Sequence, residues 1–297
     1  MIRAWVLAMM MVGAGAQGAE LYGVTGDGGT SPETLYRIDK TTGAMTFVMN
    51  LGAGGNGESI AYRPQDGYLY HASGSAPGDR YWEAIGVSVP MIVASGQLSG
   101  APDEGAESEI TALTWHAGSK LHVATTHATT FLSVTSAGVA TVVGPPVGQG
   151  PSGTVKGLVY FQGQYSGPVY TTLMGCAAFL PRVYFMEATG RVEDTHLLKL
   201  GGVDSGGCNG LAIDPATGVA YVVIRPADNS GRYLATFTPS TAASCCDATP
   251  IALLSDKVAS IAFVPEPGRT TMLAVGALVL LTMRYGRAWR PRRCWHG

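Results

Sequence analysis

The stretch Gly210-Leu211-Ala212-Ile213-Asp214-Pro215-Ala216-Thr217-Gly218-Val219-Ala220-Tyr221-Val222-Val223 contains two short apolar runs separated by turn-forming residues. Leu211 and Ile213 alternate with the small Ala212, which is the period of two of a half-buried strand. Residues 214–218 favour a turn, and a β-branched and aromatic run follows them. The stretch therefore predicts a β-hairpin.

Approximate copies of this hairpin recur along the chain. The first strand of each copy is marked by one apolar residue, and the markers are Ile60, Leu113, Leu158, Leu211 and Ile261. They are separated by 53, 45, 53 and 50 residues. Periods of roughly 40 to 50 residues with four strands per unit are typical of propeller blades. The sequence therefore predicts five blades, and no further copy of the hairpin supports six or seven.

The other strands of each unit follow the same order. The second strands carry an aromatic ring or an imidazole that we align as Tyr70, His122, Tyr170 and Tyr221. We predict third strands at residues 35–39, 81–87, 130–135, 183–187 and 233–238. We predict fourth strands at residues 45–49, 91–94, 139–143, 195–200 and 250–254.

The last copy, residues 260–263, has a first strand and no second one. Residues 20–24 resemble residues 68–72, and Tyr22 precedes Tyr70 by 48 residues. The N-terminal strand can therefore complete the last blade and remove the free sheet edges. We predict an all-β, five-bladed β-propeller closed by this strand. The alternative, a two-sheet sandwich, predicts no period of about fifty residues.

Residues 1–19 predict a secretory signal peptide, because Arg3 is followed by an apolar run and then by small residues. Cleavage after Ala16 fits the small-x-small rule best, and cleavage after Ala19 is the alternative. A membrane anchor would need roughly 20 apolar residues, which is longer than this run. We therefore predict that the propeller, residues 20–264, is exported.

The C-terminal segment, residues 265–297, has three parts in a fixed order. Pro265, Glu266 and Pro267 come first, and an apolar segment at residues 270–283 follows. The basic cluster after it consists of Arg284, Arg287, Arg290, Arg292 and Arg293. An apolar segment of this length is near the short limit of a transmembrane helix, and the arginines would keep the tail in the cytoplasm.

This order of parts resembles the PEP-CTERM sorting signal of Gram-negative bacteria. The resemblance implies processing by an exosortase-like protease, passage through the inner membrane, and delivery to the cell surface or the extracellular space. It also implies a bacterium that makes exopolysaccharide, so that a glycan or another surface protein is the expected partner. The tail departs from the family by continuing to residues 294–297. A plain C-terminal anchor is the alternative.

The central domain is acidic. Seven of the 19 basic residues lie in the two end segments, whereas 20 of the 21 acidic residues lie between Glu20 and Val264. Phosphate binding needs a basic face, and residues 20–264 contain no cluster of lysine and arginine. We therefore exclude nucleic acid as a partner.

The rim of the channel is the predicted binding site. Two sets of loops open on the same face of a propeller: the loops that lead into the first strand of each blade, and the loops that join the second and third strands. The residues two positions before the markers are Glu58, Thr111, Lys156, Asn209 and Ala259. We predict that the first four bind a ligand.

These four side chains do not form a catalytic ring. Glycosidases need paired carboxylates, and lactonase-like propellers need several oxygen ligands around one divalent cation. We therefore predict a binding or structural protein with no cofactor and no enzymatic activity. The alternative is an exported hydrolase or lactonase with its site at the channel mouth. Three or more carboxylate or amide oxygens that converge at the rim would favour the enzyme.

No metal site is predicted. His116, His122 and His127 are spaced irregularly on different elements. Residues 27–29 and 228–231 lack the ligand series of a calcium loop and are interpreted as ordinary turns.

Cysteine usage fits an oxidising compartment. Cys176 and Cys208 are assigned to loops on one face, so a disulfide between them is possible. The adjacent Cys245 and Cys246 could form a vicinal disulfide or remain two thiols.

Overall fold

The computed structural model describes residues 18–52, 58–74, 78–163, 170–240 and 245–266. The chain divides into two units, of which Ala19–Val264 is the folded domain discussed below. Residues 1–17 of the predicted signal peptide, Pro267, the apolar segment and the arginine cluster from Arg284 to Arg293 lie outside the described residues. Ala19, the last residue of the predicted signal peptide, is buried and begins the first strand. Within the described part of the chain, no helix is long and apolar enough to cross a membrane.

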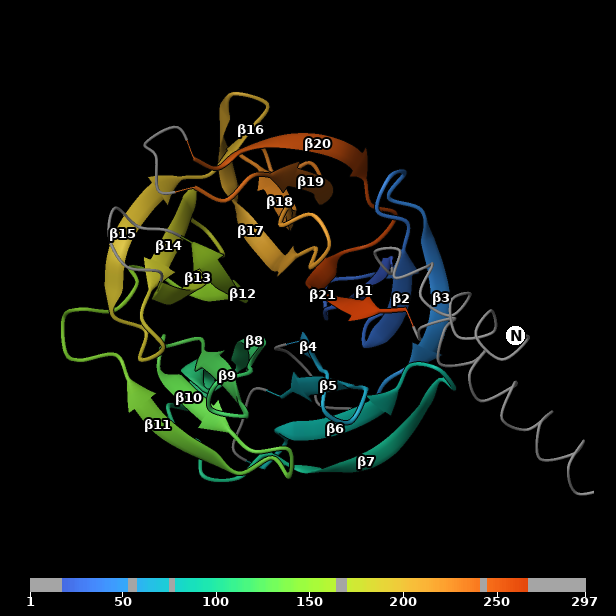
Figure 1. The fold of residues 1–297 in the computed structure, drawn as a ribbon, viewed down its shortest axis with the longest axis vertical. Helices are drawn as coiled ribbons and strands as arrows, with labels where there is room; N and C mark the ends of the chain where they lie inside the picture. Colours follow the sequence, from blue (N-terminus) through green and yellow to red (C-terminus); the bar gives the residue numbers. More distant parts are fainter. Residues whose placement is uncertain (1–17, 53–57, 75–77, 164–169, 241–244, 267–297) are drawn as a thin grey trace, which may run out of the picture. The chain divides into compact units, whose positions relative to one another are not determined.

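Four of the sheets in this domain have four antiparallel strands each (Figure 1). The first has the order β21-β1-β2-β3, formed by Val258–Pro265, Ala19–Thr25, Thr34–Ile38 and Met45–Asn50. The second contains β4 to β7, which are Ser59–Arg63, Tyr68–Ser73, Tyr81–Gly86 and Met91–Gln97. The third contains β8 to β11, which are Ile110–His116, Leu121–Thr126, Phe131–Val134 and Ala140–Gly144. The fourth contains β12 to β15, which are Val155–Gly163, Tyr170–Ala177, Arg182–Met186 and Val192–Leu197.

The remaining strands form a closed group. They are β16 to β20, which are Lys199–Leu200, Val203–Ile213, Ala220–Pro226, Tyr233–Phe237 and Asp247–Leu253. The short β16 pairs antiparallel with β17 and parallel with β20, which closes these strands into a barrel. The fold is therefore all-β and propeller-like with four four-stranded blades. The prediction of five equivalent units did not include the barrel.

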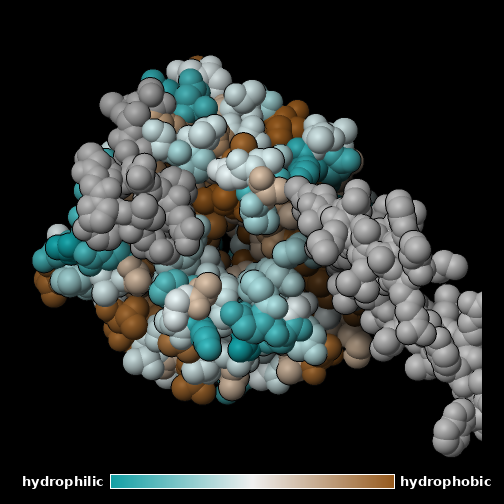
Figure 2. All heavy atoms as spheres, in the orientation of Figure 1, coloured by the Kyte–Doolittle hydropathy of each residue, from teal (hydrophilic) through white to brown (hydrophobic). Residues whose placement is uncertain are grey.

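The sheets surround a common centre, and β21, β4, β8, β12 and β17 lie nearest to it (Figure 1). Figure 2 shows a hollow in the middle of this face, with apolar atoms visible inside it. Two glycines allow the inner strands to approach one another. A Cβ atom on Gly157 would lie 2.7 Å from the Cβ of Leu211, and one on Gly210 would lie 3.0 Å from the backbone nitrogen of Ile261.

The N-terminal strand has the predicted partner. β1 lies between β21 and β2, and its register with β2 pairs Leu21 with Ile38 and Val24 with Leu35. All four of these side chains are buried. The predicted pairing of the first strand with the last is therefore confirmed.

The predicted alignment of the second strands is only half right. Tyr70 and Tyr221 each lie ten residues after their marker and pair with the residue that follows it. In the third sheet Val123 occupies this position, so the alignment of His122 was wrong by one residue. In the fourth sheet the equivalent position is Met174, and Tyr170 lies at the beginning of β13, because the pairing of β12 with β13 continues further, to Gly163 and Tyr170. The length of the hairpin, and not aromatic character, therefore sets which residue pairs with the one after the marker: it lies ten residues after the marker in three hairpins and sixteen after it in the fourth sheet.

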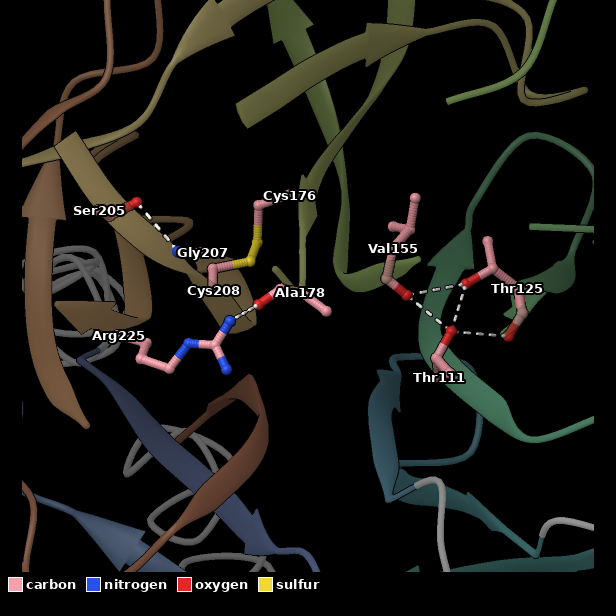
Figure 3. The surroundings of a disulfide bond; sticks show 9 residues. All are labelled: Thr111, Thr125, Val155, Cys176, Ala178, Ser205, Gly207, Cys208 and Arg225. Carbon is pink, nitrogen blue, oxygen red and sulfur yellow. Dashed lines mark hydrogen bonds between the residues drawn. A yellow bond between two sulfur atoms is a disulfide. The ribbon is translucent and has the colours of Figure 1, made fainter. Parts of the chain in front are cut away.

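The structure contains the predicted disulfide between Cys176 and Cys208, with a Cα–Cα distance of 6.0 Å (Figure 3). Both residues are buried and lie in strands, β13 and β17, and not in loops as predicted. The bond therefore joins the fourth sheet to the barrel. Cys245 and Cys246 are bonded to each other in the turn before β20.

Candidate functional site

A cavity of about 290 Å³ lies beside the beginnings of β4, β12 and β21 and the middle of β17. Its lining residues are Gly26, Asp27, Gly28, Glu58, Glu109, Lys156, Asn209, Arg232, Lys257 and Ala259. The structure thus brings Glu58, Lys156 and Asn209 together, as the rim prediction requires. Carboxylates, cationic groups and one amide share this small space.

Thr111, the fourth predicted rim residue, does not face the cavity. Its side chain is fully buried, and its Oγ1 donates a hydrogen bond to the carbonyl of Val155 at 2.6 Å (Figure 3). Thr125 Oγ1 lies 3.2 Å away from the same hydroxyl. Thr111 therefore ties β8 to β12, because a hydroxyl on an inner strand reaches the neighbouring sheet before it reaches solvent.

The polar groups of the predicted rim residues differ in whether they have hydrogen-bond or ion-pair partners. Lys156 forms an ion pair with Glu109, so its charge is compensated. Asn209 Oδ1 is buried and has no hydrogen-bond partner among the described residues. An unpaired buried amide oxygen costs free energy, so this atom is a natural acceptor for a ligand.

Glu58 belongs to a buried row of hydrogen-bonded ionisable side chains. His71 Nε2 lies 2.5 Å from Glu58 Oε2, and His71 Nδ1 lies 2.9 Å from Glu83 Oε2. The backbone N–H of Gly52 donates to both carboxylate oxygens of Glu83 at 3.1 Å. Burial alone lowers the pKa of His71, but hydrogen bonds and charge from the two carboxylates raise this pKa to about 9. The imidazole is therefore protonated at neutral pH and donates from both nitrogens.

Two further carboxylates converge on Glu58. Asp27, Glu33 and Glu58 each offer one carboxylate oxygen, and these three atoms lie within 4.8 Å of one another. Asp27 is exposed, Glu33 is half-buried and Glu58 is buried. Burial raises the pKa of Glu58, the hydrogen bond with His71 opposes this shift, and the charges of Glu33 and Asp27 raise the pKa further. These carboxylates are the described residues that could hold a metal ion.

The loop that carries Asp27 and Glu33, residues 26–33, has a defined conformation. The backbone N–H groups of Thr30 and Ser31 donate to the two carboxylate oxygens of Asp256, at 2.7 and 3.0 Å. The N–H of Glu33 donates to the carbonyl of Thr25 at 3.1 Å, and the φ angle of Glu33 is 51°. Residues 27–29 lie in a turn, as predicted, and Asp27 in this turn also lines the cavity.

Sequence reasoning did not find His71, Glu83, Asp27 or Glu33. One indication was present: Glu83 is a charged residue between two apolar neighbours in a predicted strand, and it is buried. A carboxylate at such a position needs a buried partner.

The three histidines considered for a metal site lie in different surroundings. The ring of His116 stacks on Tyr160 at 4.2 Å, and His127 lies 3.6 Å from Glu107 and from Glu109. His122 lies between aromatic rings, with Tyr70 at 4.6 Å.

No family model and no curated protein matches the sequence. Among solved structures, a protein of unknown function from Bacteroides caccae is similar, with a TM-score of 0.51 and 9% identity over 84% of this chain and 100% of that chain. The periplasmic gluconolactonase of Pseudomonas aeruginosa has a TM-score of 0.42 and 16% identity over 77% of this chain and 81% of its own. A structural genomics protein of unknown function from Bacteroides thetaiotaomicron has a TM-score of 0.47 and 15% identity, over 86% of this chain and 67% of that chain. At these identities the likeness concerns the fold alone.

Proposed function

We propose that β17 to β20 are the fifth blade of a five-bladed propeller and that β16 is an addition to it. Two observations support this. β17, β18, β19 and β20 pair consecutively and antiparallel, as the strands of the other blades do. The marker Leu211 lies on β17, which is the strand of this group that lies nearest to the centre (Figure 1).

We propose that this propeller is an exported binding protein and that its cavity holds a polar ligand rich in hydroxyl groups, such as a glycan. The observation that carries this proposal is that Asn209, whose buried Oδ1 has no partner among the described residues, lines a cavity that also offers carboxylate and cationic groups. Hydroxyl groups both donate and accept hydrogen bonds, so a sugar can satisfy the amide and the charged groups together. Exopolysaccharide, or the glycan of another surface protein, is the proposed source.

A glycan array with the purified full chain tests this function. We expect binding to one class of glycan, and we expect Asn209→Ala to weaken the affinity at least tenfold because it removes the unpaired acceptor. Asn50→Ala is the matched control, since Asn50 is exposed at the end of β3, and it should bind like the parent protein. Absence of glycan binding, or equal affinity of the Asn209 variant, would overturn the proposal.

We further propose that a PEP-CTERM-like signal delivers the protein to the cell surface. The sequence supports this through Pro265, Glu266 and Pro267, the apolar segment and the arginine cluster. In this proposal, the C-terminal helix holds the precursor in the inner membrane until an exosortase-like protease releases it.

Cell fractionation with an antibody against the propeller tests the sorting signal. Glu266→Gln should leave an uncleaved, membrane-bound form, whereas neutral residues in place of the five arginines from Arg284 to Arg293 should loosen membrane retention. If the Glu266 variant is released as efficiently as the parent, the segment is a plain anchor.

Hydrolysis of a lactone or a glycoside is the second candidate function. The observation that favours it is the convergence of three carboxylates, from Asp27, Glu33 and Glu58, of which Asp27 and Glu58 line the cavity; such convergence is the condition that the sequence prediction sets for an enzyme. A panel of lactones and aryl glycosides tests it. Turnover that Asp27→Asn reduces at least tenfold would support an enzyme, and no turnover above the buffer rate would reject one.

A further inference from the structure

We propose that Asp27, Glu33 and Glu58 bind one divalent cation that prefers oxygen ligands, of the kind of calcium or magnesium. This site does not rest on the proposed glycan binding, because a cation can occupy it without an organic ligand. It also goes beyond the sequence interpretation, which predicted no metal.

The size of the cluster fits a single ion. Calcium–oxygen distances are about 2.3 to 2.6 Å, so two ligands on opposite sides of one ion lie roughly 4.6 to 5.2 Å apart. The three carboxylate oxygens lie within 4.8 Å of one another, so each can reach the same ion.

The buried member of the cluster supplies an independent indication of a ligand. The side chain of Glu58 is 0% exposed. Its Oε2 accepts the hydrogen bond from His71, and its Oε1 has no hydrogen-bond partner in the described part of the chain. A buried carboxylate oxygen without a partner is costly, and a bound cation would satisfy it.

Groups behind the cluster hold Glu58 in place. His71 donates to Glu58 from one ring nitrogen and to Glu83 from the other, and Glu83 accepts from the backbone of Gly52. Such hydrogen-bonded support is typical of metal ligands, because it fixes the orientation of the coordinating group.

The rest of the site is suited to a hard cation with open coordination positions. The three ligands are carboxylates, and oxygen ligands favour calcium and magnesium over zinc or copper. Asp27 is exposed and lines the cavity beside Glu58, so water or a ligand hydroxyl can complete the coordination shell from that side. The contacts of residues 30 and 31 with Asp256 fix the loop that carries the other two ligands.

Isothermal titration of the purified full chain with CaCl₂, after removal of metal with EDTA, tests the site. A repeat with MgCl₂ follows. We expect one ion per chain, and we expect Asp27→Asn to weaken the affinity at least tenfold. Glu193→Gln is the matched control, because Glu193, on β15, is an exposed carboxylate paired with Arg191. This variant should bind like the parent protein.

Glu58→Gln should abolish cation binding, but it also alters the buried hydrogen-bonded group of Glu58, His71 and Glu83. Asp27→Asn is therefore the decisive variant, since Asp27 is exposed. Failure of both ions to bind, or unchanged affinity of the Asp27 variant, would overturn the site. Because these titrations contain no glycan, a negative result in the glycan array has no bearing on them.

Discussion

Glu58 and His71 form a fully buried ion pair, with His71 Nε2 2.5 Å from Glu58 Oε2 and both side chains 0% exposed. Glu83 binds the other ring nitrogen, so the imidazolium lies between two carboxylates. Removing the cation leaves both carboxylates buried without compensation, which typically costs about 3 to 5 kcal/mol. We expect His71→Leu to lose about this much stability in urea denaturation at pH 7. His127→Leu, at a half-buried site, is the control, and a loss below about 1 kcal/mol for the His71 variant would contradict the ion pair.

The N-terminal strand should stabilise the whole domain, because β1 connects β21 to β2. Leu21 on this strand is 1% exposed, and truncating a buried leucine typically costs about 2 to 5 kcal/mol. We expect Leu21→Ala to lower the free energy of unfolding by that amount. The same substitution at Leu253, which is 56% exposed, should change it by less than about 0.5 kcal/mol. Equal melting temperatures for the two variants would show that β1 does not support the ring.

Gly157 is required by the close approach of β12 to β17. A Cβ atom there would lie 2.7 Å from the Cβ of Leu211 and 2.8 Å from its backbone nitrogen, so the inner strands would have to separate. Overpacking of this kind typically costs about 1 to 3 kcal/mol. We expect that loss for Gly157→Ala in urea denaturation. At Gly96 on β7 nothing lies within 4 Å of an added Cβ, so Gly96→Ala should be tolerated, and similar stability of both variants would refute the explanation.

The strands could be predicted from the sequence because their determinants are local. Alternating apolar residues and turns of the type at residues 214–218 specify a hairpin from neighbouring positions alone. The predicted third and fourth strands agree with the observed ones to within a few residues. The predicted strand at residues 195–200 was wrong at its end: β15 stops at Leu197, and Lys199 and Leu200 form the separate β16. Two residues carry no period of their own, and their pairing with β20 depends on tertiary structure.

The candidate site could be predicted only in part. Glu58, Lys156 and Asn209 hold equivalent positions in the repeat, so symmetry placed them at one rim. Asp27 and Glu33 lie in the loop between the second and third strands of the last unit, which the prediction places on the rim face, but no local series of ligands marks them as neighbours of Glu58. A sequence motif shows ligands at fixed, short spacings, and residues that are distant in the sequence have no such spacing.

His122 should make the stability of the domain depend on pH. Its ring is fully buried among Tyr70, Trp82 and Trp115, at centroid distances of 4.6, 5.1 and 4.9 Å. Burial, and then the charge of Arg63, lower the pKa of His122 to about 3. The folded protein therefore keeps this imidazole neutral between pH 7 and pH 4.

The unfolded chain, in contrast, protonates the same imidazole below its ordinary pKa of about 6.5. The unfolded state then binds more protons than the folded state, so stability falls as the pH is lowered from 7 towards 3. For this one group the loss between pH 7 and pH 5 is about 2 kcal/mol. We expect His122→Phe, which keeps an aromatic ring in the cluster, to lose correspondingly less stability over that interval than the parent protein. Urea denaturation of both proteins at pH 7 and pH 5 measures the difference, and contributions from groups such as His71 cancel because both proteins share them. If the two proteins lose equal stability, His122 is not held neutral in the folded state.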